Sequence, residues 1–317
     1  VIRTPLYLFA LWKGLEGAEV AHIFSASYWS FLLAPFPAWV LAKIRGAKAL
    51  INYRSGEARD HLSRWRTALP VLRRADGLVV PSAYLADVFR DFGLEARVIP
   101  NFIDETVFHY RPRRPLKPCL VFTRGFGVYY SADLVVRAFA EVQQKWPEAT
   151  LSLAGTGPEE SRVRALVEEL GLDGIDLIGP VGRDQIALCY DRADIFINAS
   201  WLDNMPVSIL EAFASGTPVV TTAPEGIRYL VRHEQTGLLC APGDWRALAE
   251  NVLRLLAEPD LAARLAESAF LESRKYRWSA VRSQWLELYN ALARRSLSPN
   301  APSPERPEAE QQPARSS

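Results

Sequence analysis

The sequence lacks the clusters of cysteine and histidine from which metal centres and disulfide frameworks are built. It holds three cysteines and four histidines in 317 residues. The cysteines, Cys119, Cys189 and Cys240, are far apart and show no C-x-x-C spacing, so neither a disulfide framework nor a zinc site is indicated. No H-E-x-x-H pair and no D-x-D triplet occurs either. We therefore expect no metal, no cofactor, and the reduced cysteines of a cytoplasmic protein.

A strong net charge is also missing. The 37 lysines and arginines nearly balance the 36 aspartates and glutamates, which leaves a net charge of +1. A chain with this balance has no overall field that would attract a polyanion. We therefore expect no nucleic-acid partner.

No apolar run is long enough to span a membrane. The most apolar stretch, residues 28–42, is too short, and Pro35 and Pro37 interrupt it. We expect a buried helix there, with a peripheral contact to a membrane surface as the alternative. A signal peptide is not expected either.

Strands alternate with helices along the chain, which predicts an α/β fold with parallel sheets. In the first part we expect strands at residues 19–24, 49–53, 77–80 and 96–99, and helices at 28–44, 57–74 and 82–91. Pro70 should bend the second of these helices. In the second part we expect strands at 119–123, 150–153, 175–178, 195–198 and 219–222, and helices at 132–145, 159–170, 184–190, 245–257, 261–276 and 279–294. The length suits two domains.

Residues 200–222, SWLDNMPVSILEAFASGTPVVTT, combine a turn, a short helix and a strand. Asp203 and Asn204 are typical N-cap residues, Pro206 suits the first helical turn, and Gly216 ends the helix. The helix N-terminus offers free N–H groups and a positive dipole end, which suit a phosphate. Glu211, one turn inside, could accept hydrogen bonds from the paired hydroxyls of a sugar. The alternative is an ordinary crossover helix with Glu211 facing water.

This stretch resembles the acidic-x7-Glu motif of family 4 glycosyltransferases. Asp203 is the first acid, Asn204-Met205-Pro206 the turn and Glu211 the second acid, and Gly-x-Pro-Val-Val follows. Residues 100–104 are similar to the family's Pro-Asn-Gly-Val-Asp segment, and residues 236–239 match its Thr-Gly-Leu-Leu segment. The resemblance implies the GT-B fold, in which two Rossmann-like domains face each other across a cleft. It also implies a retaining enzyme with a nucleotide-sugar donor.

The resemblance divides the chain into four parts. An acceptor-side domain should occupy residues 1–113, and a domain that binds the nucleotide sugar should occupy residues 114–276. Residues 277–296 should form a helix that crosses back to the first domain, and residues 297–317 should be a disordered tail. The strand, Gly-rich loop and helix with which a family member begins are not found, so the first domain is expected to be incomplete.

Roles for particular residues also come from the resemblance. Glu211 should bind the ribose hydroxyls, and Asp203 should lie near the donor sugar, with helix capping as the alternative. The diphosphate should face the turn and the first helical N–H groups, at residues Asn204, Met205, Val207 and Ser208. The nucleotide should also meet Gly155 of a glycine turn and the backbone of Val181.

Arg124 should stabilise the leaving diphosphate, because it follows the first strand of the second domain, where the family carries Gly-Arg-x-x-x-x-Lys. A surface arginine is the alternative. Tyr130 holds the place of the family's lysine. Arg54 and Glu57 follow a first-domain strand where many members have a histidine, and either could contact donor or acceptor, with surface capping as the alternative.

The sequence thus predicts a retaining, metal-independent glycosyltransferase with an unidentified acceptor, which could be a saccharide, a lipid-linked group or a small molecule. The missing lysine and histidine leave a second reading open, a catalytically inactive subunit that binds nucleotide sugars or acts as a scaffold. A third reading is another GT-B enzyme, such as a nucleotide-sugar epimerase or a phosphorylase.

Overall fold

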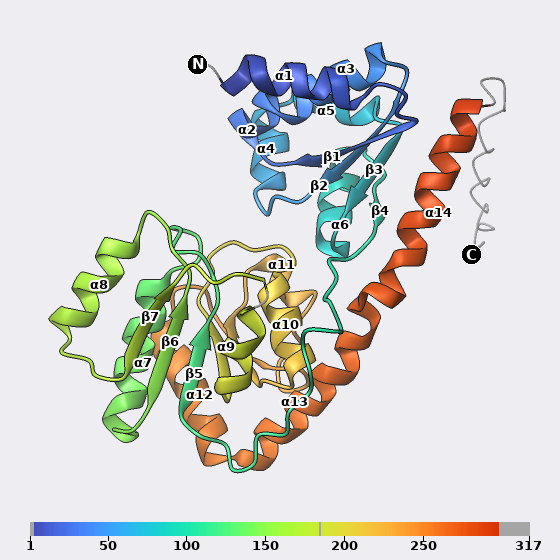
Figure 1. Cartoon of the computed structure of the whole chain (residues 1–317). Helices are drawn as coiled ribbons and strands as arrows, with labels where there is room; N and C mark the ends of the chain where they lie inside the picture. Colours follow the sequence, from blue (N-terminus) through green and yellow to red (C-terminus); the bar gives the residue numbers. More distant parts are fainter. Residues whose placement is uncertain (1–2, 184, 298–317) are drawn as a thin grey trace, which may run out of the picture.

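The computed structural model describes residues 3–183 and 185–297, which build two parallel sheets (Figure 1). The first sheet has the strand order β1-β2-β3-β4, and all its neighbours are parallel. Its strands are β1 (Val20–Ser25), β2 (Lys48–Tyr53), β3 (Gly77–Val80) and β4 (Arg97–Val98). The predicted strands of this part are therefore all present.

The helices of the first part are shorter than the sequence suggested. They are α1 (Arg3–Gly14), α2 (Tyr28–Leu33), α3 (Pro35–Ile44), α4 (Ala58–Arg64), α5 (Ala68–Arg73) and α6 (Ala83–Asp91). The single helix predicted over 28–44 is wrong: the chain breaks at Ala34, directly before Pro35. This fits the steric pressure that a proline exerts on the residue before it.

The predicted bend at Pro70 is also wrong. The chain leaves the helix at Trp65, and α5 then begins at Ala68. Pro70 therefore lies in the first turn of a new helix, where the missing N–H of a proline costs no helical hydrogen bond. Helix α1, at the start of the described chain, was not predicted.

The second sheet has the order β10-β9-β8-β5-β6-β7, again all parallel. Its strands are β5 (Cys119–Phe122), β6 (Thr150–Ala154), β7 (Ile175–Gly179), β8 (Ile195–Asn198), β9 (Val219–Thr222) and β10 (Leu238–Cys240). Strand β5 lies between β6 and β8. The chain adds β6 and β7 on one side of β5, and then adds β8, β9 and β10 on its other side. In open parallel sheets ligands bind at such a switch point, beyond the carboxyl ends of the strands.

Helices cover both faces of this sheet (Figure 1). They are α7 (Ala132–Lys145), α8 (Glu160–Glu169), α9 (Ile186–Arg192), α10 (Val207–Ser215), α11 (Glu225–Arg228), α12 (Trp245–Ala257), α13 (Pro259–Ser273) and the short η1 (Arg274–Tyr276). One apolar cluster packs α7, α12 and the first half of α13 against the sheet, and another packs α9 and α10 on the opposite side, joined there by Ala269 of α13. The two faces are therefore buried separately.

The last helix, α14 (Trp278–Leu297), returns to the first sheet, as Figure 1 shows. Its Val281, Trp285 and Leu292 pack with Leu50 of β2 and Val79 of β3 in one buried cluster. The helix that was expected to cross back is thus seen. Of the expected tail, Leu297 ends α14, and residues 298–317 lie outside the described residues.

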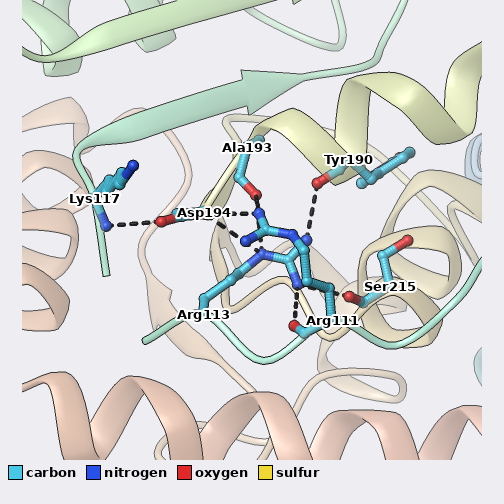
Figure 2. Close-up of polar contacts among 7 residues, drawn as sticks. All are labelled: Arg111, Arg113, Lys117, Tyr190, Ala193, Asp194 and Ser215. Carbon is cyan, nitrogen blue, oxygen red and sulfur yellow. Dashed lines mark hydrogen bonds and ion pairs between the residues drawn. The ribbon is translucent and has the colours of Figure 1, made fainter. Parts of the chain in front are cut away.

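The segment between the two sheets is anchored to the second sheet's helices by a buried arginine (Figure 2). The side chain of Arg113 is 2% exposed. It donates hydrogen bonds to the backbone carbonyls of Tyr190, Ala193, Ser215 and Arg111. Ser215 ends α10, and Tyr190 lies in the last turn of α9, so the guanidinium satisfies carbonyls that helix ends leave free.

A single carboxylate completes this anchor (Figure 2). Asp194 pairs with Arg111 at 2.7 Å and accepts a hydrogen bond from the Lys117 N–H at 2.8 Å. Burial lowers the pKa of Arg113 to about 10, and Arg111 beside it acts in the same direction. The segment is thus fixed on the second domain rather than free to swing.

Within the described residues, no helix is both long enough and apolar enough to cross a membrane. The three cysteines are free.

Candidate functional site

Two adjoining cavities lie between the carboxyl ends of the two sheets. The larger has a volume of about 630 Å³ and the smaller about 350 Å³. Arg54 and Asn101 of the first sheet's loops and Val207 of α10 line both. The cavities therefore form one cleft with the beginning of α10 at its centre.

The N-terminus of α10 has no side-chain cap. Its N-cap residue is Pro206, so the predicted place of this proline in the first turn is wrong by one position. The predicted capping by Asp203 and Asn204 is wrong as well, because Asp203 accepts the N–H of Asn204 instead. The N–H groups of Val207 and Ser208 consequently have no acceptor among the hydrogen bonds of the described residues. They remain available to a ligand.

Arg124 and Asp203 meet at the smaller cavity. Arg124 follows β5 and Asp203 follows β8, and these strands are neighbours in the sheet. The Arg124 Nη2 lies 2.5 Å from Asp203 Oδ2, and the two side chains are 14% and 11% exposed. Burial raises the pKa of Asp203, while the adjacent guanidinium acts against that rise. The pairing of two residues 79 positions apart follows from the order of the strands.

The surroundings of Arg124 fix its position. The ring of Tyr130, in the place of the family's lysine, lies 4.1 Å from the guanidinium carbon. Gly155 packs on the Arg124 backbone so closely that a Cβ there would lie 2.2 Å from the Arg124 carbonyl oxygen. Gly155 is thus required by close packing, and it lies on neither cavity wall.

Glu211 lies on the wall of the larger cavity and is half-buried. Its Oε2 accepts a hydrogen bond from Tyr190 Oη at 2.9 Å. The same hydroxyl is 2.6 Å from Thr123 Oγ1 and 2.9 Å from the Ser208 carbonyl oxygen. Burial raises the pKa of Glu211, and the bond from Tyr190 works against the rise. One carboxylate oxygen is therefore fixed by the protein while the residue faces the cavity.

Of the other residues predicted to contact the nucleotide sugar, some line a cavity and others lie on neither cavity wall. Asn204, Met205 and Val207 line the smaller cavity. Ser208 is buried and lies on neither cavity wall. Val181 also lies on neither wall, although Arg183 and Ile186, which follow it in the chain, line the larger cavity. Contacts of Ser208, Val181 and Gly155 with a ligand stay predictions.

Several buried polar atoms around α10 have no partner among the described residues. They are Asn204 Nδ2, Ser208 Oγ and Arg124 Nε. Asn204 is 4% exposed and accepts a hydrogen bond from Ser82 of the first domain through Oδ1. Buried donors are normally satisfied, so an unpartnered amide on a cavity wall points to a missing ligand or water.

The wall of the larger cavity opposite α10 was not predicted from the sequence. It is lined by aromatic side chains from the first sheet, the connecting segment and α14, namely His22, Phe24, Phe102, Trp278, Trp285 and Tyr289. His22 Nδ1 lies 2.7 Å from Tyr289 Oη, and burial lowers the pKa of His22 to about 4, with Arg54 adding to the effect. His22 is the third of the six residues of β1 and not its last, so its place in the strand did not point to the cavity.

Within the described part of the chain, no group of three or more His, Cys, Asp or Glu residues is arranged to hold a metal ion.

Two family models together match most of the chain. Residues 112–271 match "Glycosyl transferases group 1", and residues 1–107 match "Glycosyltransferase Family 4". An exopolysaccharide phosphotransferase of Streptomyces coelicolor is 30% identical over 92% of this chain and 31% of its own length. An N-acetyl-alpha-D-glucosaminyl L-malate synthase of Bacillus anthracis is 29% identical over 63% of this chain and 55% of its own. The chain thus spans from a third to about half of these relatives.

Solved structures show the same fold. A sucrose-phosphate synthase of Thermosynechococcus elongatus superposes with a TM-score of 0.78 at 24% identity, over 91% of this chain and 78% of that one. The Anabaena protein HepE in complex with UDP gives 0.74 at 18% identity, over 90% and 82%. The predicted GT-B fold is therefore confirmed. With a family model over half of its length, the chain belongs to the group 1 glycosyl transferases.

Proposed function

We propose that this chain transfers a sugar from a nucleotide diphosphate-sugar to an acceptor, with retention of the anomeric configuration and without a metal ion. One observation carries the proposal. The uncapped N-terminus of α10 lies at the centre of an interdomain cleft, with Glu211 one turn inside it and facing the larger cavity. In a nucleotide the diphosphate is attached directly to the pentose, and the two groups need these two kinds of partner.

The donor would lie across both cavities. Its diphosphate meets the N–H groups of Val207 and Ser208, where the helix dipole favours negative charge. The free amide donor of Asn204 is available on the same side. The pentose hydroxyls bind the Glu211 carboxylate, and the base occupies the larger cavity towards Arg183. This places the sugar to be transferred in the smaller cavity, beside Asp203.

The chemistry then has one main requirement, the stabilisation of the leaving diphosphate. The bond between the anomeric carbon and the phosphate oxygen breaks, and its electron pair stays on the diphosphate. Arg124, already oriented by Asp203 and Tyr130, is the cation nearest to that group on the second domain. The acceptor hydroxyl approaches from the first domain, past residues 54–57, and its proton passes to a leaving phosphate oxygen.

Uridine nucleotides are the first donors to test, because HepE was solved with UDP and with UDP-glucose. The proposed acceptor is a saccharide, a lipid-linked group or a small molecule, with peripheral membrane contact as an alternative. Free cysteines agree with the proposed cytoplasmic location.

The binding claim is tested by calorimetric titration of UDP, GDP and ADP and of their glucose conjugates. We expect one of these series to bind, and Glu211→Ala to weaken that binding about 10–100-fold, the usual effect of losing hydrogen bonds to a charged group. Glu168→Ala, at an exposed position of α8, is the matched control and should bind as wild type does. Absence of binding in every series, or equal affinity of Glu211→Ala, would contradict the proposal.

A second candidate, an inactive nucleotide-sugar-binding subunit, is favoured by one feature. Tyr130 stacks on Arg124 where the family carries a lysine, so this side of the cleft holds one cation fewer. Turnover of a labelled donor separates the two candidates. Sugar transfer, or slow hydrolysis of the donor, supports the enzyme, whereas tight binding without either supports the inactive subunit. Isomerisation of the donor in the absence of an acceptor would instead indicate an epimerase.

A further inference from the structure

Arg54 occupies a central position in the cleft that the motif did not reveal. It follows β2, lines both cavities and is exposed to them. Its Nη2 donates to Asn101 Oδ1 at 2.6 Å, and Asn101 Nδ2 donates to the Met205 carbonyl oxygen at 2.7 Å. The guanidinium is thus linked through one side chain to the turn that precedes α10. A group of the first domain is held next to the anion-binding end of a second-domain helix.

The charges in the cleft set Arg54 apart from its neighbours. Three arginines line the two cavities, and two of them have carboxylate partners: Arg124 pairs with Asp203 at 2.5 Å, and Arg183 pairs with Asp104 at 3.4 Å. Among the described residues, no carboxylate forms an ion pair with Arg54; its partner is the neutral amide of Asn101. Partial desolvation within the cleft lowers the pKa of Arg54.

An uncompensated cation at this place suits a ligand's negative charge. The nearest parts of the proposed donor are its distal phosphate and the attached sugar, because Arg54 lies on the wall of the smaller cavity as well as beside Val207. Position 130 holds a tyrosine and not the lysine that the resemblance leads one to expect. The second cation needed by a diphosphate therefore has to come from elsewhere, and Arg54 is in position to supply it.

We propose that Arg54 binds the distal, sugar-bearing phosphate of the donor from the first domain, opposite the N-terminus of α10. This rests on the proposed function and names the residue that distinguishes a diphosphate from a monophosphate. When the bond between that phosphate oxygen and the anomeric carbon breaks, the electron pair remains on the phosphate, and Arg54 stabilises the added charge. The diphosphate is thus bound from both sides only when the two domains face each other.

Calorimetric titration with UMP and with UDP tests this assignment, with the guanosine and adenosine pairs run in parallel. We expect Arg54→Gln to weaken the affinity for UDP about 10–100-fold, as the loss of a charge-assisted hydrogen bond does. The affinity for UMP should stay that of wild type. Arg54→Lys should retain part of the affinity because it keeps the charge. Arg59→Gln removes the same charge from the same domain at a position on neither cavity wall, and it should leave both affinities unchanged.

Three results would overturn the assignment. UDP bound by Arg54→Gln as tightly as by wild type would show that the residue makes no contact with the distal phosphate. An equal loss of affinity for UMP and for UDP would show that Arg54 has a structural role. A loss seen with UDP-glucuronic acid but not with UDP would show that the residue binds a carboxylate of the sugar. If wild type binds no nucleotide, the proposed function fails; if UDP binding depends on Glu211 but not on Arg54, this inference alone fails.

Discussion

Glu211 shows how far a short motif determines a site at the scale of single residues. The motif places a carboxylate one turn inside a helix, and the structure puts it on a cavity wall as that pattern predicts. The hydroxyl that fixes it belongs to Tyr190, on another helix, 21 positions earlier. Nothing in the local pattern selects that tyrosine, because the contact depends on how α9 packs against α10. The sequence therefore predicted that Glu211 lies at the cleft, and it missed the tyrosine that fixes its position.

The raised pKa of Glu211 leads to a prediction about pH. Burial favours the neutral form, so protonation begins at a higher pH than for an ordinary glutamate. In the proposed complex the ionised form of Glu211 accepts the hydrogen bonds of the pentose. We therefore expect the affinity for UDP-glucose to be complete at pH 8 and to fall as the pH drops through the raised pKa. Calorimetry at stepped pH between 5 and 8 measures this.

The choice of UDP-glucose as ligand and the Glu211→Gln variant together separate Glu211 from other titrating groups. UDP-glucose has no phosphate group of the kind that titrates near pH 6, unlike UDP itself. His22, with its pKa lowered to about 4, stays neutral over the whole interval. Asp203 and Arg124 also lie close, and Asp203 titrates in the same direction as Glu211. Glu211→Gln should bind weakly and with a much flatter dependence; an unchanged dependence in that variant would assign the effect elsewhere.

At the scale of elements, the sequence predicted strands better than helix ends. Every predicted strand is present, and the central ones, such as β2, β8 and β9, are the buried apolar runs typical of a parallel sheet. The predicted helix boundaries were wrong near two prolines. Helices α2 and α3 separate at Ala34, before Pro35, and the chain leaves the helix before α5 begins, several residues before Pro70. The first error arose because a proline disfavours the helical conformation of the residue before it, here Ala34 before Pro35. The second arose because a proline is tolerated in the first turn of a helix, where Pro70 lies in α5.

The arginine anchor between the sheets makes a prediction about stability. Arg113→Met would remove the donor that four backbone carbonyls share and would leave them buried. Removing one partner of a buried polar network costs about 3–5 kcal/mol, so we expect the thermal midpoint of the second domain to fall markedly. Arg114→Met, at a neighbouring and mostly exposed side chain, is the control and should leave the midpoint nearly unchanged. Equal midpoints in the two variants would contradict the role given to Arg113.

At the scale of the whole molecule, the cleft is formed by contacts that no local pattern encodes. Ser82 of the first domain bonds Asn204 at the turn before α10, and Tyr129 of the second bonds Glu57 of the first at 2.8 Å. Helix α14 holds the domains together from the other side through its packing on the first sheet. The two-domain fold could be predicted from the motif order, and the strand before Arg54 already suggested that this residue lines the cleft, whereas the aromatic wall required the assembled pair.

The central claim is that a nucleotide's diphosphate rests on the N-terminus of α10 while Glu211 holds the pentose. A crystal structure of the chain grown with UDP-glucose, or with the sugar nucleotide that binds in the titrations, tests it most directly. We predict phosphate oxygens within hydrogen-bonding distance of the Val207 and Ser208 N–H groups, and both ribose hydroxyls on the Glu211 carboxylate. A nucleotide bound outside the two cavities, or bound in the cleft with its phosphates away from α10, would contradict the account.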